Sequence, residues 1–143
     1  MGQSIKDSCL IRCYPSMFDL DSMVNFVVRE HDRICGKPCH YESSLLESAI
    51  ATTFQSAFGQ YIYQTKVQKA ACLFYEIIEN HPFDDGNKRT ALTITMMYLK
   101  SNNCNVAATE EDFANLAIRV AENILSLQDV ELWFIDHLSD LSK

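Results

Sequence analysis

The chain has 143 residues, of which 48% are hydrophobic and 22% charged, a composition typical of a globular protein large enough to bury a core. Lysine and arginine number 12 against 19 aspartates and glutamates, so the formal net charge is −7, which disfavours nonspecific binding to nucleic-acid phosphates. No run approaches the roughly 18 apolar residues of a membrane span, and the N-terminus lacks a signal-peptide pattern. We therefore expect a single domain, residues 1–143, in the cytoplasm, that binds neither nucleic acid nor membrane.

Six cysteines could form disulfides in a small secreted protein. Because a secretory signal is missing and a core is available, free thiols in a reducing cytosol are the favoured interpretation. The spacing Cys35-x-x-x-Cys39-His40 is unusual for structural zinc and has no obvious second ligand pair, so metal binding is the less favoured alternative.

The first half of the chain predicts two helices and a short hairpin. Asp21 or Ser22 can cap a helix that runs to about Ile34. Residues 41–54 predict the next helix, with four apolar positions facing inward: Leu45, Leu46, Ala49 and Ile50. Short alternating patterns at residues 8–13 and 61–63 can pair as a small flap. The alternative is that Tyr61 and Tyr63 are ordinary half-buried loop aromatics.

Two apolar helical patterns flank residues 81–90. In residues 66–78 apolar side chains recur at the spacing of one helix face: Val67, Ala70, Ala71, Phe74, Ile77 and Ile78. Residues 89–100 are apolar almost all round, which predicts a helix buried on most sides. A polar loop between two buried helices is held rigidly, as a preorganised site requires.

The last third of the chain predicts two further helices. Thr109 is followed by Glu110, Glu111 and Asp112, acids that favour the positive end of a helix dipole. Ser126 with Asp129 three residues later repeats this pattern. With 4 glycines and 3 prolines the chain lacks the turn density of an all-β protein. We expect an all-α bundle with a possible short β-hairpin flap.

The loop at residues 81–90 reads His-Pro-Phe-Asp-Asp-Gly-Asn-Lys-Arg-Thr. Pro82 disfavours helical geometry at His81, so the preceding helix should end there. The His81 imidazole can accept a proton near neutral pH, and Phe83 should anchor the loop in the core. Asp85 can coordinate a divalent cation or orient a substrate, and Gly86 lets the backbone approach a ligand closely.

The helix that follows should begin at Asn87 and offers an anion site at its N-terminus. Lys88 and Arg89 oppose the helix dipole there, at a cost of a few tenths of a kcal/mol or more, and a bound phosphate would remove the conflict. The alternative is a plain polar turn with solvated cations, since Asp-Asp-Gly-Asn is favourable turn chemistry.

This run resembles the signature of the Fic/Doc superfamily, His-x-Phe-x-(Asp/Glu)-(Gly/Ala)-Asn-(Gly/Lys)-Arg. All seven specified positions agree: His81, Phe83, Asp85, Gly86, Asn87, Lys88 and Arg89. The likeness is closest to the Doc (death-on-curing) toxins of toxin–antitoxin systems. Their loop ends Asn-Lys-Arg-Thr-Ala-Leu, as residues 87–92 do here, and an upstream segment reads Leu-Leu-Glu-Ser-Ala, as residues 45–49 do. The resemblance covers at least residues 20–106 and implies a Fic/Doc-type helical bundle.

Two departures from AMP-transferring Fic enzymes bear on the implied activity. Those enzymes usually have glycine at the position of Lys88, which leaves room for the nucleotide α-phosphate, and a second arginine at the position of Leu92. Both changes favour the Doc-like reaction, in which ATP is held in the opposite sense and its γ-phosphate passes to a protein hydroxyl. AMP transfer, and an inactive Fic-fold module that only binds or regulates, remain the alternatives.

The resemblance also implies roles for the loop residues. His81 would take the proton from the target hydroxyl, and Asp85 would hold Mg²⁺ or orient the attacking group. The phosphates of ATP would be gripped by the start of the helix: Gly86, Asn87, Lys88 and Arg89. The target would lie beside a flap formed by Tyr61, Ile62 and Tyr63. The known target of the Doc family is a threonine of elongation factor Tu, so translation would stop.

A lethal enzyme needs a restraint. Ser43 and Glu47 fit the spacing of the Ser/Thr-x-x-x-Glu segment that blocks the nucleotide site in some Fic proteins, but Ser48 replaces the usual glycine or asparagine. A partner antitoxin is therefore the favoured restraint.

Overall fold

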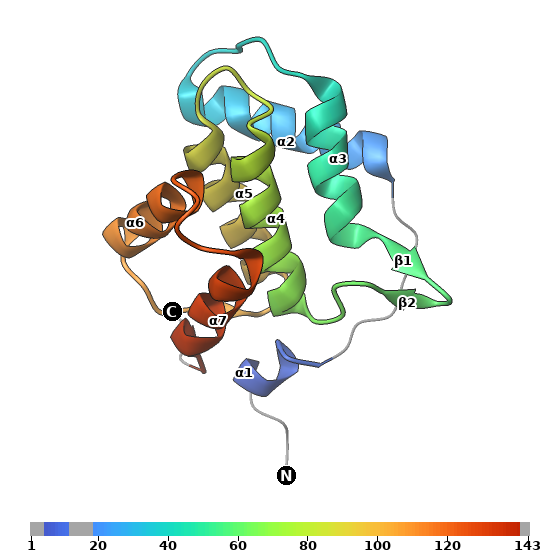
Figure 1. Cartoon of the computed structure of the whole chain (residues 1–143), viewed down its shortest axis with the longest axis vertical. Coiled ribbons are helices and arrows are strands. Elements are labelled where there is room, and N and C mark those ends of the chain that lie inside the picture. The colour runs from blue at the N-terminus through green and yellow to red at the C-terminus, as the bar shows by residue number, and fades with distance from the viewer. Residues whose placement is uncertain (1–4, 12–18, 141–143) are drawn as a thin grey trace.

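In the computed structural model, which describes residues 5–11 and 19–140, the chain folds as a bundle of helices with small two-stranded sheets at its edges (Figure 1). The helices are α1 (Ile5–Ser8), α2 (Leu20–Cys35), α3 (Ser43–Phe54), α4 (Lys66–Asn80), α5 (Asn87–Ser101), α6 (Glu110–Ala121) and α7 (Leu127–His137). The strands are β1 (Ser56–Ala57), β2 (Gln60–Tyr61), β3 (Asn105–Val106) and β4 (Leu138–Ser139). The predicted all-α bundle with a small hairpin is confirmed. Within the described ranges, none of the helices has the length and apolar character to cross a membrane.

Helix α4 is the centre of the core. The whole apolar face predicted for residues 66–78 is buried. Helices α3 and α5 pack along it, and α7 contributes Phe134, whose ring meets that of Phe74 edge-on with centroids 6.0 Å apart. Because α4 runs through the middle of the bundle (Figure 1), the loop at its C-terminal end follows directly from a buried helix.

The apolar positions of helix α5 are buried or half-buried, so the prediction of a helix buried on most sides holds for all of them except Met97. Ala91, Ile94 and Leu99 are buried, whereas Met97 is 37% exposed. On α3, Leu46 is buried but Leu45 is 38% exposed, so the prediction that Leu45 faces inward is wrong. Much of the surface of a folded protein is apolar, so hydropathy alone cannot separate such positions from the core.

Side-chain caps set most of the helix starts. The predicted capping pairs Thr109–Asp112 and Ser126–Asp129 are both present as reciprocal capping boxes. Helix α2 is capped by Asp19, not by Asp21 or Ser22 as predicted. Its carboxylate accepts from the Ser22 backbone N–H at 3.3 Å and from the Ser22 hydroxyl at 2.7 Å. A cap accepts from the second or third residue inside the helix, and Asp19 has that offset.

The hairpin before α4 forms between residues 56 and 61, so the predicted pairing of residues 8–13 with 61–63 is wrong. Ser56 pairs with Tyr61 and Ala57 with Gln60. Phe58 and Gly59 form the two-residue turn between them, with φ of 54° and 76°, as a type I′ hairpin turn requires. Of the other predicted strand, the described residues up to Ile11 belong to α1 and the turn after it, and residues 12 and 13 lie outside the described ranges.

Cys9 and Cys104 form a disulfide across 95 residues of sequence, so the prediction of free thiols is wrong for this pair. Their Cα atoms are 5.8 Å apart, within the usual range for a disulfide. The start of α4 holds both segments: the Val67 N–H donates to the Cys9 carbonyl at 3.3 Å, and the Lys66 ammonium donates to the Asn102 carbonyl at 3.1 Å. Cys35 and Cys39 are free and half-buried, and Cys72 is free and buried.

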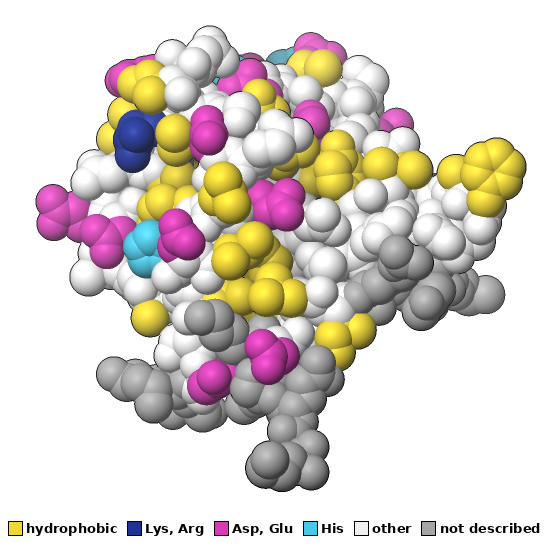
Figure 2. Space-filling model, turned by 60° about the horizontal axis from the view of Figure 1, so that its bottom comes forward, with side chains coloured by type: hydrophobic (Ala, Val, Ile, Leu, Met, Phe, Trp, Pro, Cys, Tyr) yellow, Lys and Arg dark blue, Asp and Glu magenta, His cyan; other side chains and the backbone are white. Residues whose placement is uncertain are grey.

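The surface reflects the acidic composition. On the face drawn in Figure 2, acidic side chains are scattered between apolar ones, with little basic surface. Within residues 5–11 and 19–140, the large apolar side chains that are most exposed are Phe58 (103%), Leu132 (58%), Ile124 (56%) and Ile62 (52%). Phe58 and Ile62 lie at the hairpin, Ile124 lies between α6 and α7, and Leu132 lies on α7. Exposed apolar side chains are common in folded proteins.

Candidate functional site

The loop between α4 and α5 begins where the sequence predicts. Helix α4 ends at Asn80, and His81 caps it in the left-handed conformation, with φ of 50° and ψ of 54°. The His81 N–H donates to the Ile77 carbonyl at 3.2 Å. Pro82 prevents continuation of the helix, so the His81 imidazole is left exposed at the end of a buried helix.

Asn87 holds this loop together from inside. Its side chain is 4% exposed. Its amide oxygen accepts from the Phe83 N–H at 2.9 Å, and its amide nitrogen donates to the Phe83 carbonyl at 2.7 Å and faces His81 Nδ1 at 3.1 Å. The two backbone contacts define the orientation of the amide, so Nδ1 of His81 accepts a hydrogen bond and a neutral His81 carries its hydrogen on Nε2. The side-chain amide of Asn87 thus makes its hydrogen bonds to other residues of the loop. A ligand would therefore meet the backbone N–H of Asn87 and not its side chain.

The segment before α3 holds the same loop from outside. The Glu42 N–H donates to the Pro82 carbonyl at 2.8 Å, and the Asp84 N–H donates to the His40 carbonyl at 3.0 Å. Tyr41 and Phe83 form the antiparallel bridge between these two bonds.

Phe83 anchors the loop in the core as predicted. It is 1% exposed and lies between two rings. The His31 ring stacks on it at 4.0 Å between centroids with an interplanar angle of 4°, and the Tyr41 ring is tilted against it at 5.6 Å. The loop is therefore clamped by residues that lie far from it in sequence.

A cavity of about 330 Å³ lies at the N-terminus of α5 and is closed on its other side by α6. Its lining residues are Asp85, Gly86, Asn87, Lys88, Arg89, Leu92, Ala114, Ala117 and Ile118. Gly86 caps α5 with φ of 85° and no side-chain hydrogen bond, whereas α2, α4, α6 and α7 each have a side-chain cap. The first N–H groups of α5 thus have no capping side chain, and with the exposed Lys88 and Arg89 they make this cavity suited to an anion.

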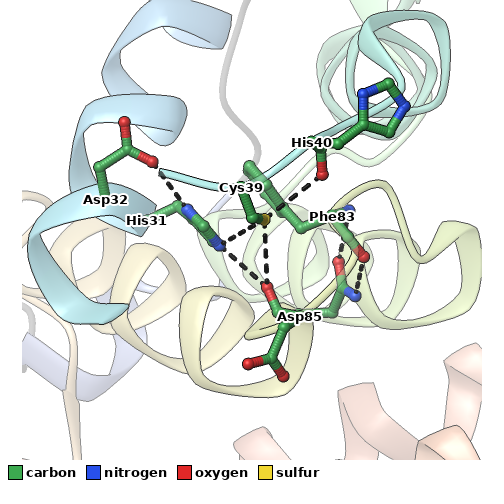
Figure 3. Close-up of polar contacts among 7 residues, drawn as sticks. His31, Asp32, Cys39, His40, Phe83 and Asp85 are labelled. Atoms are coloured by element: carbon green, nitrogen blue, oxygen red, sulfur yellow. Dashed lines mark hydrogen bonds and ion pairs between the residues drawn. The ribbon is translucent and has the colours of Figure 1, made fainter. Parts of the chain in front are cut away.

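The carbonyl and the carboxylate of Asp85 face opposite sides of the loop. Its carbonyl oxygen faces His31, while its carboxylate points the other way (Figure 3) and is exposed at the cavity. In the described part of the chain no group of three His, Cys, Asp or Glu side chains is gathered for a metal ion. A Mg²⁺ ion at Asp85 fits this donor set if phosphate and water supply its remaining ligands, the usual arrangement for Mg²⁺ with nucleotides.

The structure does not bring every predicted site residue together. Residues 61–63 precede α4 and the loop follows it, so they lie at opposite ends of a 15-residue helix (Figure 1), about 22 Å long. The structure therefore does not bring the residues of the predicted substrate flap to the loop. Tyr61 is instead 9% exposed and lies over the Lys69 ammonium, which is 3.8 Å from the ring centroid. Among the described residues, neither His81 nor Glu47 lines the cavity.

The sequence does not predict that His31 contacts the loop. His31 is 1% exposed and its Nε2 lies 2.9 Å from the Asp85 carbonyl oxygen (Figure 3). The two residues are 54 apart in sequence, and a lone histidine on a helix carries no signal for such a contact. Only the packing of α2 against the loop reveals it.

The similarity to known proteins agrees with this geometry. The chain is 36% identical to the Toxin Doc of Mycolicibacterium smegmatis (strain ATCC 700084 / mc(2)155) over 64 residues, which cover 45% of this chain and 49% of that toxin. The match thus spans about half the length of the toxin. The sequence model of the Fic/DOC family matches residues 16–99, more than half of the chain and all of the loop. The chain therefore belongs to the Fic/DOC family.

Proposed function

We propose that this chain is a Doc-like phosphotransferase that transfers the γ-phosphate of ATP, with Mg²⁺, to a hydroxyl of a protein target. The observation that carries the proposal is the cavity at the start of α5, where Gly86, Lys88 and Arg89 line one wall. Phosphoryl transfer depends mostly on positioning and on stabilising the charge of the phosphoryl oxygens. A rigid loop with free N–H groups and two cations meets that requirement.

The cavity wall favours phosphoryl transfer over AMP transfer. Leu92 lines the cavity at the position where the resemblance places the second arginine of AMP-transferring enzymes. An apolar side chain there offers no charge to a terminal phosphate. Lys88 also lines the cavity, at the position where the resemblance places the glycine that leaves room for an α-phosphate.

His81 is the proposed general base, and its hydrogen bond to Asn87 sets a condition on that role. Because Nδ1 accepts from the Asn87 amide, the hydrogen of a neutral His81 is on Nε2. The ring can accept the proton of a target hydroxyl at Nε2 only after this hydrogen has left Nε2, or at Nδ1 after the ring has turned so that Nδ1 faces the target. A general base of this kind contributes about 10²–10⁴ to the rate.

We propose that the target lies along the segment at residues 40–42 instead of the hairpin before α4. The His40 carbonyl and the Glu42 N–H face the loop, so in this antiparallel pairing the N–H and carbonyl of Tyr41 face outward. An extended target segment can add to that edge. Its hydroxyl side chain would then lie next to the loop.

The biological setting follows from the similarity to a protein named Toxin Doc. We propose that the target belongs to the translation machinery, elongation factor Tu by resemblance, that a partner antitoxin restrains the enzyme, and that it acts in the cytoplasm. Expression of the chain without an antitoxin should therefore arrest growth.

To decide between these functions, the purified chain is incubated with Mg²⁺, a cell lysate and labelled ATP. One reaction contains ATP labelled at the γ-phosphate and the other ATP labelled at the α-phosphate. Label from γ-ATP on a protein supports the proposal, label from α-ATP means AMP transfer, and label from neither indicates a binding module. His81→Ala should abolish labelling with the fold intact. The matched control is His137→Ala on α7, because that imidazole has its Nδ1 2.7 Å from the Trp133 carbonyl oxygen and does not face the loop.

The docking edge is tested by a pair of substitutions at Tyr41. Tyr41→Ala and Tyr41→Pro both remove the ring, but only proline removes the outward N–H. Target labelling should fall further with proline than with alanine, while ATP binding should be equal in the two variants. Equal labelling by the two variants would exclude strand addition at this edge.

A further inference from the structure

We propose that His31 is a positioning residue that fixes the peptide between Asp85 and Gly86, and so aligns the Asp85 carboxylate with the N-terminus of α5. This role rests on the proposed phosphotransfer. His31 lies on α2, outside the family signature, and is not among the residues that line the cavity. It therefore acts through the loop and not on a ligand.

The hydrogen bonds of His31 point to this role. Its Nε2 lies 2.9 Å from the Asp85 carbonyl oxygen, and its Nδ1 lies 2.9 Å from a carboxylate oxygen of Asp32 (Figure 3). Both ring nitrogens thus face oxygen acceptors, and each contact is a hydrogen bond when that nitrogen carries a hydrogen. The contact with the Asp32 carboxylate orients the ring so that Nε2 is directed at the Asp85 carbonyl oxygen.

The ring is fixed in two further ways. One face stacks on Phe83 at 4.0 Å, and the ring is 1% exposed. The Cys39 sulfur is 3.5 Å from Nε2. His31 therefore has little freedom to turn away from the loop.

The contact at Gly86 shows how closely α2 approaches the loop. A Cβ atom built on Gly86 would lie 2.5 Å from the Cys35 sulfur and 3.3 Å from His31 Nε2. There is no room for a side chain between them, so the Asp85–Gly86 peptide rests directly on α2. A displacement of His31 would be transmitted to the first N–H groups of α5, because the Thr90 N–H bonds to the Gly86 carbonyl at 2.9 Å.

The test compares two substitutions. His31→Phe keeps the ring stacked on Phe83 but cannot donate to the Asp85 carbonyl. His31→Gln loses the stacking but keeps an N–H donor at about the position of Nε2. We expect His31→Phe to lower kcat/KM for phosphotransfer by about 10–100-fold, the range for lost outer-shell contacts, and His31→Gln to restore most of it. Phe134→Leu, on α7 and far from the loop in sequence, is the control for loss of stability alone.

Amide hydrogen exchange at Gly86 and Asn87 gives a readout that does not require phosphotransfer. Exchange should be faster in His31→Phe than in the wild type or in His31→Gln, and Phe134→Leu should not reproduce this local change. If the wild type labels no protein but the exchange pattern holds, the proposed function fails and the positioning role stands. If His31→Phe matches the wild type in exchange and kcat/KM, or if His31→Gln is no better than His31→Phe, the inference is overturned.

Discussion

Replacing Gly86 with alanine tests how tightly the loop is seated on α2. Gly86 has φ of 85°, and an L-residue in that conformation costs roughly 1–2 kcal/mol. The added methyl group would also lie 2.5 Å from the Cys35 sulfur. Relieving such an overlap in a packed site typically costs about 1–3 kcal/mol. We therefore expect Gly86→Ala to lower the free energy of unfolding by about 2–5 kcal/mol.

The two contributions can be separated with variants of this chain. Gly36 has φ of 78°, and a Cβ atom added to it would have nothing within 4 Å, so Gly36→Ala should show only the conformational cost. In the Gly86→Ala background, Cys35→Ala removes the sulfur and should recover about 1–3 kcal/mol, giving a negative coupling energy in a double-mutant cycle.

Urea unfolding of the four members of the cycle, together with Gly36→Ala, measures these values. Two results would refute the reasoning: a Gly86→Ala cost no larger than that of Gly36→Ala, or no recovery on removing the Cys35 sulfur. Either would mean that Gly86 is required for its backbone conformation alone and that α2 does not support the loop.

Three further predictions follow from the packing and the charges. Asp112→Asn should destabilise the protein at pH 7, and the effect should shrink as the pH falls below 3.8. Hydrogen bonds with Thr109 hold the pKa of Asp112 below its ordinary 3.8, so its contribution is present above pH 3.8 and is lost as the pH falls through the folded value. Urea unfolding over a series of pH values checks this. Burial raises the pKa of Cys72 to about 11, so iodoacetamide at pH 8 should label it only after unfolding, as peptide mass spectrometry would show. Phe134→Ala should lower the free energy of unfolding by about 3–5 kcal/mol, since this fully buried ring meets Phe74; a cost below about 1 kcal/mol in urea would contradict that packing.

The local parts of the fold are readable from the sequence because their causes are local. The period of Val67 to Ile78 predicts the buried face of α4, and Pro82 predicts where that helix ends. Thr109 and Asp112 predict a helix start because a capping box needs only residues three apart. The 81–90 run predicts the family for the same reason, since its residue types and spacing lie within one loop.

What the sequence by itself determined is therefore the helical bundle and the loop whose residues suit it to phosphate chemistry. The tertiary structure decided which distant residues support that loop: His31 beneath Asp85, residues 40–42 along its edge, and the hairpin before α4 at the opposite end of a helix. It also decided that Cys9 meets Cys104. These contacts join residues tens of positions apart, and they depend on how the helices pack, which no local pattern of residues records.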